Sequence, residues 1–329
     1  MKRTLVAALL ILLSDITPAA AGETIVVAGA FVDSSVAAPY LQLRTERGRD
    51  EYRFGISGWT IEGSWVRKLS PSRALLFSAD ATPFNAHSSE YIYVDGERAS
   101  NLEYENASYR IKGGLRLTHD ARSHTDVQLV ALSEQLGEEV DPSLARQWNE
   151  PYAGVDVAYA YSHRTNENPL VSAWDGLELG LRGEAYSGQE TWSRFTATEA
   201  AARTRGRLHF RQSITLMAGD SLTIVNRFLV GGSWDALGPT ALYGLRYAEY
   251  RVDRALVASG GIDYLLPRHW RVGLRASCMR SNVENLCGQA VNASTTWKTV
   301  GVNMGVGLSP DHDPTLYVAV VAPLYRRVR

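Results

Sequence analysis

The chain has 329 residues and a formal net charge of -1, and it contains 28 glycines, 16 tyrosines and 8 tryptophans. The balanced charge argues against a nucleic-acid partner. Past Gly22 no apolar run reaches 18 residues, so the sequence offers no transmembrane helix.

The first 21 residues have the three parts of a secretory signal peptide. They are a basic start at Met1–Arg3, an apolar run at Leu5–Leu13 and small residues at Pro18–Ala21. This order is typical of an exported protein, and the apolar run is too short for a membrane anchor. We predict cleavage after Ala21.

Most of the remaining chain alternates polar and apolar residues with a period of two, which indicates β-strands with one wet and one apolar face. Residues 22–38 are either a periplasmic lead-in or a first strand, and residues 39–329 are expected to form the barrel described below. In chain order, the alternating segments are residues 39–46, 52–67, 74–81, 103–118, 125–132, 155–162, 177–184, 203–216, 222–232, 255–266, 270–278, 295–308 and 316–325.

Residues 203–216 show the alternation most clearly, and we interpret them as one strand. Arg203 to Arg211 supply the polar register, whereas Leu208, Phe210 and Ile214 fall in the apolar one. A membrane-spanning strand needs about 9–11 residues, and this segment is long enough. A soluble antiparallel sheet gives the same pattern. The alternation of short turns with long polar connections favours an outer-membrane barrel.

The number of strands can be estimated from these alternating segments. Thirteen segments read as strands, but a closed bacterial barrel needs an even number. We expect the missing strand in residues 23–32 or 240–251. The predicted fold is all-β, a transmembrane antiparallel β-barrel of about 14 strands, with 12 and 16 as the alternatives.

Basic residues recur in the polar register of these strands. Facing lipid, each arginine would cost about 2–4 kcal/mol at the bilayer midplane, so we expect them in the lumen together with acidic partners such as Asp156 and Glu184. Solvated ion pairs and an anion-preferring pore both explain them. The expected lumen-lining residues are Arg116, Arg182, Arg203, Arg205, Arg207, Arg211, Arg227, Arg271 and Arg275.

Cys278 and Cys287 are the two cysteines, and they bracket a polar segment between two strands. In an exported chain this spacing predicts a loop disulfide formed in the oxidising periplasm, with two free thiols as the alternative. No histidine lies between them, so we expect no metal site there, and no cofactor is predicted.

A lipid hydrolase would need a serine beside a histidine. Residues 87–90 read His-Ser-Ser-Glu, and Ser162-His163 has Asn166 close by. Neither reproduces the His-x-Ser-Asn type of motif of outer-membrane phospholipase and lipid A deacylase barrels. We therefore predict solvated histidines and no catalytic residue.

Residues 225–267 read VNRFLVGGSWDALGPTALYGLRYAEYRVDRALVASGGIDYLLP. This segment resembles the later part of the surface-antigen barrels of the BamA/TamA superfamily, especially those that follow patatin-like domains. The matching pieces are Phe228–Gly232, Tyr243–Tyr247, Glu249-Tyr250, Asp253–Leu256 and Leu266-Pro267.

In that family an Arg-Gly-Tyr/Phe loop tip folds into the lumen. The resemblance implies such a tip here at Tyr243, Gly244, Arg246 and Tyr247, in a rearranged order.

The sequence leaves no room for the POTRA domains that receive client proteins in that family, or for a patatin domain with its Gly-x-Ser-x-Gly motif, so we expect a barrel without either. The leading function is then an accessory role in envelope assembly or translocation. The alternatives are an anion-preferring porin-like channel and an outer-membrane lipid hydrolase. Expected partners are outer-membrane lipids and the barrel-assembly machinery, in the outer membrane of a Gram-negative bacterium. The sequence specifies no client, substrate or oligomeric state.

Overall fold

The structure is a computed structural model that describes residues 24–33, 37–58, 60–87, 93–94, 97–98, 104–136, 151–168, 173–188, 190–222, 226–232, 240–246, 249–298, 300–310 and 312–327. The predicted signal peptide lies outside these residues. The barrel strands are β1 (Thr24–Asp33), β2 (Ala37–Arg47), β3 (Asp50–Ser57), β4 (Thr60–Ser70), β5 (Arg73–His87), β8 (Tyr104–Thr118), β9 (Ser123–Leu136), β10 (Pro151–Asn168), β11 (Ala173–Ser187), β12 (Thr191–Arg205), β13 (Leu208–Asp220), β16 (Arg254–Leu265), β17 (Trp270–Ser281), β18 (Asn285–Trp297), β19 (Val300–Leu308) and β20 (Thr315–Arg327).

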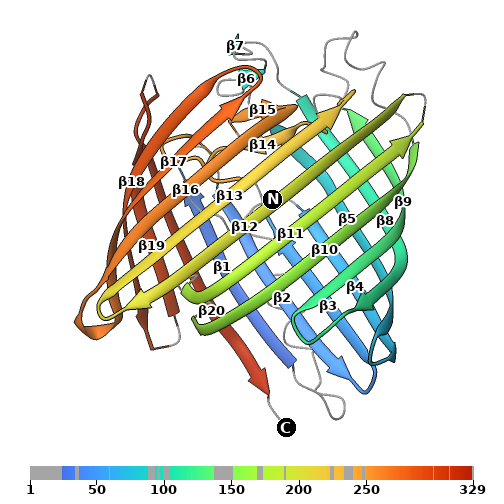
Figure 1. Ribbon diagram of the computed structural model, residues 1–329, viewed down its shortest axis with the longest axis horizontal. Helices are drawn as coiled ribbons and strands as arrows, with labels where there is room; N and C mark the ends of the chain where they lie inside the picture. The colour runs from blue at the N-terminus through green and yellow to red at the C-terminus, as the bar shows by residue number, and fades with distance from the viewer. Residues whose placement is uncertain are drawn as a thin grey trace.

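These strands form one closed antiparallel barrel in which each strand pairs with its neighbours in the chain (Figure 1). The first and last strands close it, with Cα partners from Thr24↔Arg327 to Asp33↔Tyr317. The barrel has 16 strands rather than about 14. The all-β prediction is therefore confirmed, and the preferred strand number is wrong.

The additional strands come from four places. Residues 24–33 form β1, so this segment is the first strand of the barrel. The predicted strand at 52–67 is the hairpin of β3 and β4, β12 was not predicted, and residues 295–308 contain the end of β18 and all of β19. In the opposite direction, the described residues of the predicted strand 222–232 belong to no barrel strand, and among them Phe228–Val230 form the short β14.

The predicted strand at 203–216 is also a hairpin. Arg205 pairs with Leu208 across a two-residue turn, and Gly206 takes a φ of 61° there. A positive φ of this kind is the conformation that two-residue hairpin turns require and that glycine adopts readily. The chain therefore reverses at Gly206, and the arginines before it belong to a different strand from those after it.

The connections differ at the two ends of the barrel. The turns that follow β2, β4 and β12 have two residues each, whereas the connections after β5, β9 and β13 are long. Thr24 at the start of β1 and Arg327 at the end of β20 lie at the end with the short turns. In Figure 1 the short strands β6 (Tyr93–Val94), β7 (Glu97–Arg98), β14 and β15 (Tyr250–Val252) of the long connections are at the top, and the end of β20 is at the bottom. This asymmetry is typical of outer-membrane barrels, whose short turns are periplasmic.

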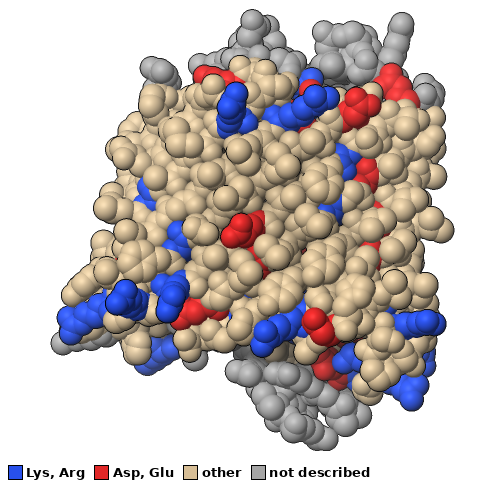
Figure 2. All heavy atoms as spheres, in the orientation of Figure 1, with Lys and Arg blue, Asp and Glu red and all other residues tan. Residues whose placement is uncertain are grey.

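The outer surface carries an apolar band. Leu129, Leu274, Ile111 and Val291 point outward from four different strands and are 52–72% exposed. Figure 2 shows that the charged side chains on the visible face gather mainly toward the two rims. Such a band with charged rims matches a barrel whose outer face contacts hydrocarbon. Among the described residues, no helix is long and apolar enough to cross a membrane.

Cys278 and Cys287 form a disulfide. It is not in a loop, because the two cysteines are direct partners on β17 and β18, with their Cα atoms 4.0 Å apart. Both side chains belong to the outward register. The prediction of a disulfide therefore holds, and its location is corrected from the turn to the wall of the barrel.

Candidate functional site

The connection between β13 and β16, residues 221–253, is named the lumen loop. Its β14 pairs with β15 (Tyr250–Val252), and β15 pairs in parallel with β6 (Tyr93–Val94) from the connection between β5 and β8. With β7 (Glu97–Arg98) these form a small second sheet at the end with the long connections (Figure 1). Two connections far apart in sequence are thus joined by backbone hydrogen bonds.

The lumen loop folds around its own apolar core against the inner wall. Val230, Leu242 and Leu245 of the loop are fully buried. Burying one such side chain contributes about 1.5–3 kcal/mol relative to leaving it exposed. The inner wall supplies the other half of the core with inward side chains of four strands. The full cluster is Met217, Phe228, Val230, Leu242, Leu245, Tyr250, Val252, Ala255, Val257, Met279 and Leu286.

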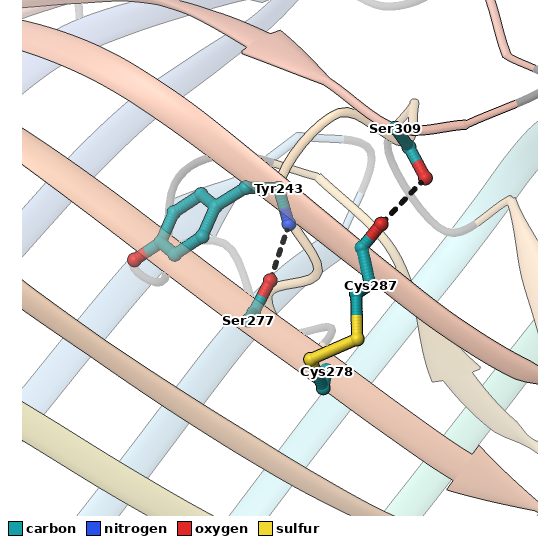
Figure 3. Close-up of a disulfide and its surroundings, with 5 residues drawn as sticks. All are labelled: Tyr243, Ser277, Cys278, Cys287 and Ser309. Carbon is teal, nitrogen blue, oxygen red and sulfur yellow. Dashed lines mark hydrogen bonds between the residues drawn. A yellow bond between two sulfur atoms is a disulfide. The ribbon is translucent and has the colours of Figure 1, made fainter.

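The tip of the loop lies directly on β17 and β18. The backbone N–H of Tyr243 donates to Ser277 Oγ at 2.8 Å, and Ser277 is itself buried (Figure 3). A Cβ added to Gly288 on β18 would collide with the carbonyl oxygen of Tyr243. Gly244 has a φ of 85°, and its backbone touches the end of β19 at Leu308. The tip therefore fits only against a wall that lacks side chains at this point.

The beginning of the loop is held on the opposite side of the lumen. Asn226 Nδ2 donates to Glu134 Oε2 on β9 at 3.2 Å, and Arg194 on β12 donates to the Asn226 carbonyl at 3.3 Å. Leu222 packs against the aromatic pair of Tyr186 and Trp192. Because β9 and β17 are six strands apart in the 16-strand ring, the loop crosses the lumen from one wall to the other.

Polar contacts also fasten the loop to the rim. Tyr250 Oη donates to Glu284 Oε2 in the turn between β17 and β18 at 3.1 Å. Arg246 lies 3.6 Å from Asp313 in the connection before β20. Arg227 and Asp253, at the two ends of the loop, form an ion pair at 3.1 Å. Tyr247, the fourth residue of the predicted tip, lies outside the described residues.

A group of charges with two buried carboxylates lies on the inner wall near the start of the loop. We name it the wall cluster, and it consists of Lys112, Asp156, Arg182, Glu184 and Arg194. Asp156, which is 3% exposed, accepts hydrogen bonds from Lys112 and from Arg182 at 2.8 Å. Glu184 accepts from Arg182 at 3.0 Å and from Arg194, which also holds the loop. Cations and carboxylates alternate along the cluster, so each of the two carboxylates lies between two cations.

The predicted lumen arginines divide into two groups. Arg116, Arg182, Arg211, Arg271 and Arg275 lie in the inward register of their strands. Most of these are paired: Arg116 donates to Asp126 at 2.7 Å, and Arg275 donates to Asp263 at 2.6 Å.

The other four arginines lie elsewhere. Arg203 and Arg205 pair with the outward-facing Phe210 and Leu208, so they belong to the outer face near the short turn. Arg207 is in that turn, and Arg227 is in the lumen loop. For these four the expectation of wall positions inside the lumen does not hold.

The serine and histidine candidates are not brought together. Ser162 and His163 are successive strand residues, so their side chains point to opposite faces, and Ser162 Oγ donates to Glu178 at 2.9 Å. Asn166 donates to Asp175 instead. Residues 88–90 and the side chain of His87 lie outside the described part. In the described residues, no group of three His, Cys, Asp or Glu side chains is placed to hold a metal ion.

The sequence reasoning missed the residues that hold the loop. Ser277 and Gly288 are ordinary strand positions in the sequence, although each is the neighbour of a cysteine. Glu134 and Asn226 are 92 residues apart, and no local pattern links them. The one usable signal for this contact was Gly288, which lies opposite Ser277. The other inward residues of β18 are larger than glycine.

No family model and no curated protein sequence matches this chain. The similarity to solved structures is clear. BamA from Haemophilus ducreyi lacking POTRA domains 1–3 superimposes with a TM-score of 0.68 over 92% of this chain and 70% of that one, at 8% identity. The fold is that of the BamA barrel.

Two CdiB barrels are similar in the same way. CdiB from Acinetobacter baumannii gives a TM-score of 0.61 at 12% identity, covering 92% of this chain and 60% of that one. CdiB from Escherichia coli gives 0.58 at 12% identity, covering 94% and 64%. This chain thus spans less than two thirds of either CdiB chain. The structural resemblance to BamA-type outer-membrane barrels is confirmed, and at these identities it concerns the fold alone.

Proposed function

We propose that this protein is an integral outer-membrane barrel that acts in envelope assembly or translocation, with the lumen loop as its working element. The observation that carries the proposal is the loop itself. It crosses the lumen from Asn226, held by Glu134, to Tyr243, held by Ser277. A passive pore has no need of an apolar core inside its lumen, whereas a barrel that controls passage needs a held and releasable element.

The anion-channel alternative has less support. An anion-preferring pore needs cations free to attract solutes, but Arg116, Arg182 and Arg275 each form an ion pair with a carboxylate. A lumen of alternating signs gives little net field. We assign no catalytic role, and the proposed partners are outer-membrane lipids, a client protein and the barrel-assembly machinery during biogenesis.

The location is tested by fractionation. We expect the mature protein in the outer-membrane fraction, with gel migration that changes after heating because folded barrels resist denaturation in detergent. Recovery as a soluble periplasmic protein would end the membrane interpretation.

The docked loop is tested with Gly288→Val. Valine at this position collides with the Tyr243 carbonyl, and overpacking of this kind costs about 1–3 kcal/mol. We expect the tip to leave the wall and the single-channel conductance in planar bilayers to rise in steps above the wild type. Gly113→Val is the matched control, because a Cβ at Gly113 meets nothing within 4 Å. Equal conductance of the two variants would contradict a docked tip.

The role in assembly is tested in cells. A strain lacking the protein should lose one or more outer-membrane or exported proteins, and the wild-type gene should restore them while the Gly288→Val gene does not. An unchanged envelope proteome together with reduced uptake of small anions would favour the channel instead.

A further inference from the structure

One carboxyl group faces outward in the middle of the apolar band. Glu199 pairs with Leu179 on one side and Ile214 on the other, and both of these are outward and exposed. It lies near the centre of the 15-residue β12. In Figure 2 an acidic group is visible in the middle of the tan band, over the region of β12 in Figure 1. In the described barrel strands, every other charged residue of the outward register is among the first or last four of its strand.

Glu199 has no hydrogen bond or ion pair within the described part of the chain. A carboxyl group in hydrocarbon needs a hydrogen-bond partner whether it is ionised or protonated. Ionisable groups at this depth in a membrane usually mark a functional contact. Acyl chains at this depth offer no donor, so a donor has to come from a protein side chain at the same depth.

The nearest polar side chain of the outer face is Gln212, the diagonal neighbour of Glu199 across β12 and β13. Stepping from β12 to β13 raises the position toward the long connections, as Figure 1 shows, and stepping back along β13 from Ile214 to Gln212 lowers it. With strands about 4.8 Å apart, a rise of about 3.3 Å per residue and a tilt of about 40°, the first step raises the position by about 3 Å and the second lowers it by about 5 Å. The two side chains therefore lie at about the same depth, within roughly 2 Å.

The surroundings allow close approach of a second surface. Ala201, Gln212, Gly260 and Ala276 are direct partners across four neighbouring strands, so this row carries small side chains except for the amide. Three residues of this row, Ala201, Gln212 and Gly260, also line a pocket whose other lining residues come from both registers of these strands. The exposed amide group of Gln212 thus lies among small side chains and diagonally beside an acceptor.

We propose that this face binds a second copy of the chain within the membrane. An acceptor and a donor at equal depth on one patch are self-complementary, because a half-turn about the membrane normal places Gln212 of each copy opposite Glu199 of the other. Two reciprocal hydrogen bonds result, which is the arrangement of a two-fold symmetric interface. Small residues let the two walls approach, as at other membrane interfaces.

The test uses disulfide cross-linking of purified protein in lipid vesicles. The two-fold axis would pass between Glu199 and Gln212, next to Ala201, so Ala201→Cys should form a covalent dimer under mild oxidation. Leu129→Cys is the control, since Leu129 is outward and 72% exposed on β9, three strands away from β12. Adding Glu199→Leu to Ala201→Cys should lower the dimer yield by about tenfold, and adding Glu199→Gln should preserve it.

Loss of the dimer is distinguishable from loss of folding. Glu199→Leu places an apolar side chain against lipid, so the barrel should still fold, and heat-modifiable migration on gels verifies the folding of each variant. Dimer yields for Ala201→Cys no higher than for Leu129→Cys would overturn the inference. A yield unaffected by Glu199→Leu would also overturn it. So would cross-linking in native membranes only to a different protein.

The inference rests on the proposed membrane location. Failure of the wild type to insert into vesicles would end both, whereas insertion without cross-linking would end only the dimer.

Discussion

Replacing Asp156 by alanine is expected to lower the free energy of unfolding by about 3–5 kcal/mol, because removing one partner of a buried ion pair leaves the other charge uncompensated. Two cations depend on this carboxylate, since Lys112 and Arg182 both donate to it. Both would then be left facing Glu184 alone. The measurement is urea-induced unfolding in lipid vesicles, followed by tryptophan fluorescence.

Glu178→Ala is the matched control for that variant. Glu178 accepts two hydrogen bonds from Arg164, but both side chains are about one third exposed. Solvent screens such a pair, so its loss should cost about 0–1 kcal/mol. Equal losses of unfolding free energy in the two variants would mean that the wall cluster is as solvated as the Arg164–Glu178 pair, and would contradict the burial of Asp156.

Ile214→Arg is expected to cost about 2–4 kcal/mol, the penalty for a basic side chain near the bilayer midplane on the lipid face of a barrel. Ile214 is 44% exposed and lies in the outward register of β13, midway along the strand. The quantity to measure is the folding yield in vesicles beside the wild type. Leu208, at the end of β13 next to the turn, should tolerate arginine better because the side chain reaches the interface.

The inward face of the same strand provides the comparison. Arg211→Leu removes a side chain of the lumen register, and we expect it to cost about 0–1 kcal/mol by analogy with solvated charges. Equal tolerance of charge changes at Ile214 and Arg211 would indicate a soluble sheet with two wet faces. The membrane location would then have to be given up.

The alternation of residues was sufficient to predict the class of the fold, because period two is a property of the strand itself. It placed Arg116, Arg182 and Arg275 correctly on the inner register. What it could not detect were two-residue turns. Such a turn makes residues i and i+3 partners, as for Arg205 and Leu208, so the face of odd-numbered residues changes across it. Reading straight through Gly206 therefore assigned Arg203 to the wrong face.

The lumen loop could be predicted only in outline. Phe228 and Val230 have the composition of a strand, and they do form one, but in the small inner sheet rather than in the wall. Apolar residues are required equally by a lipid-facing strand and by a core inside the lumen. The contacts that decide between these, such as Glu134 with Asn226, join residues far apart in the chain. Local pattern carries no information about them.

The disulfide between Cys278 and Cys287 has a consequence for biogenesis. If β18 paired with β17 in a register shifted by two residues, one sulfur atom would move by about 7 Å relative to the other, beyond the span that a disulfide bridges. A hairpin oxidised before it enters the membrane is therefore already committed to one alignment. That alignment turns Ser277 and Gly288, the immediate neighbours of the two cysteines, to the inside. The disulfide on the outer face of the barrel thus keeps the two inner-face residues that the lumen loop contacts in register throughout insertion.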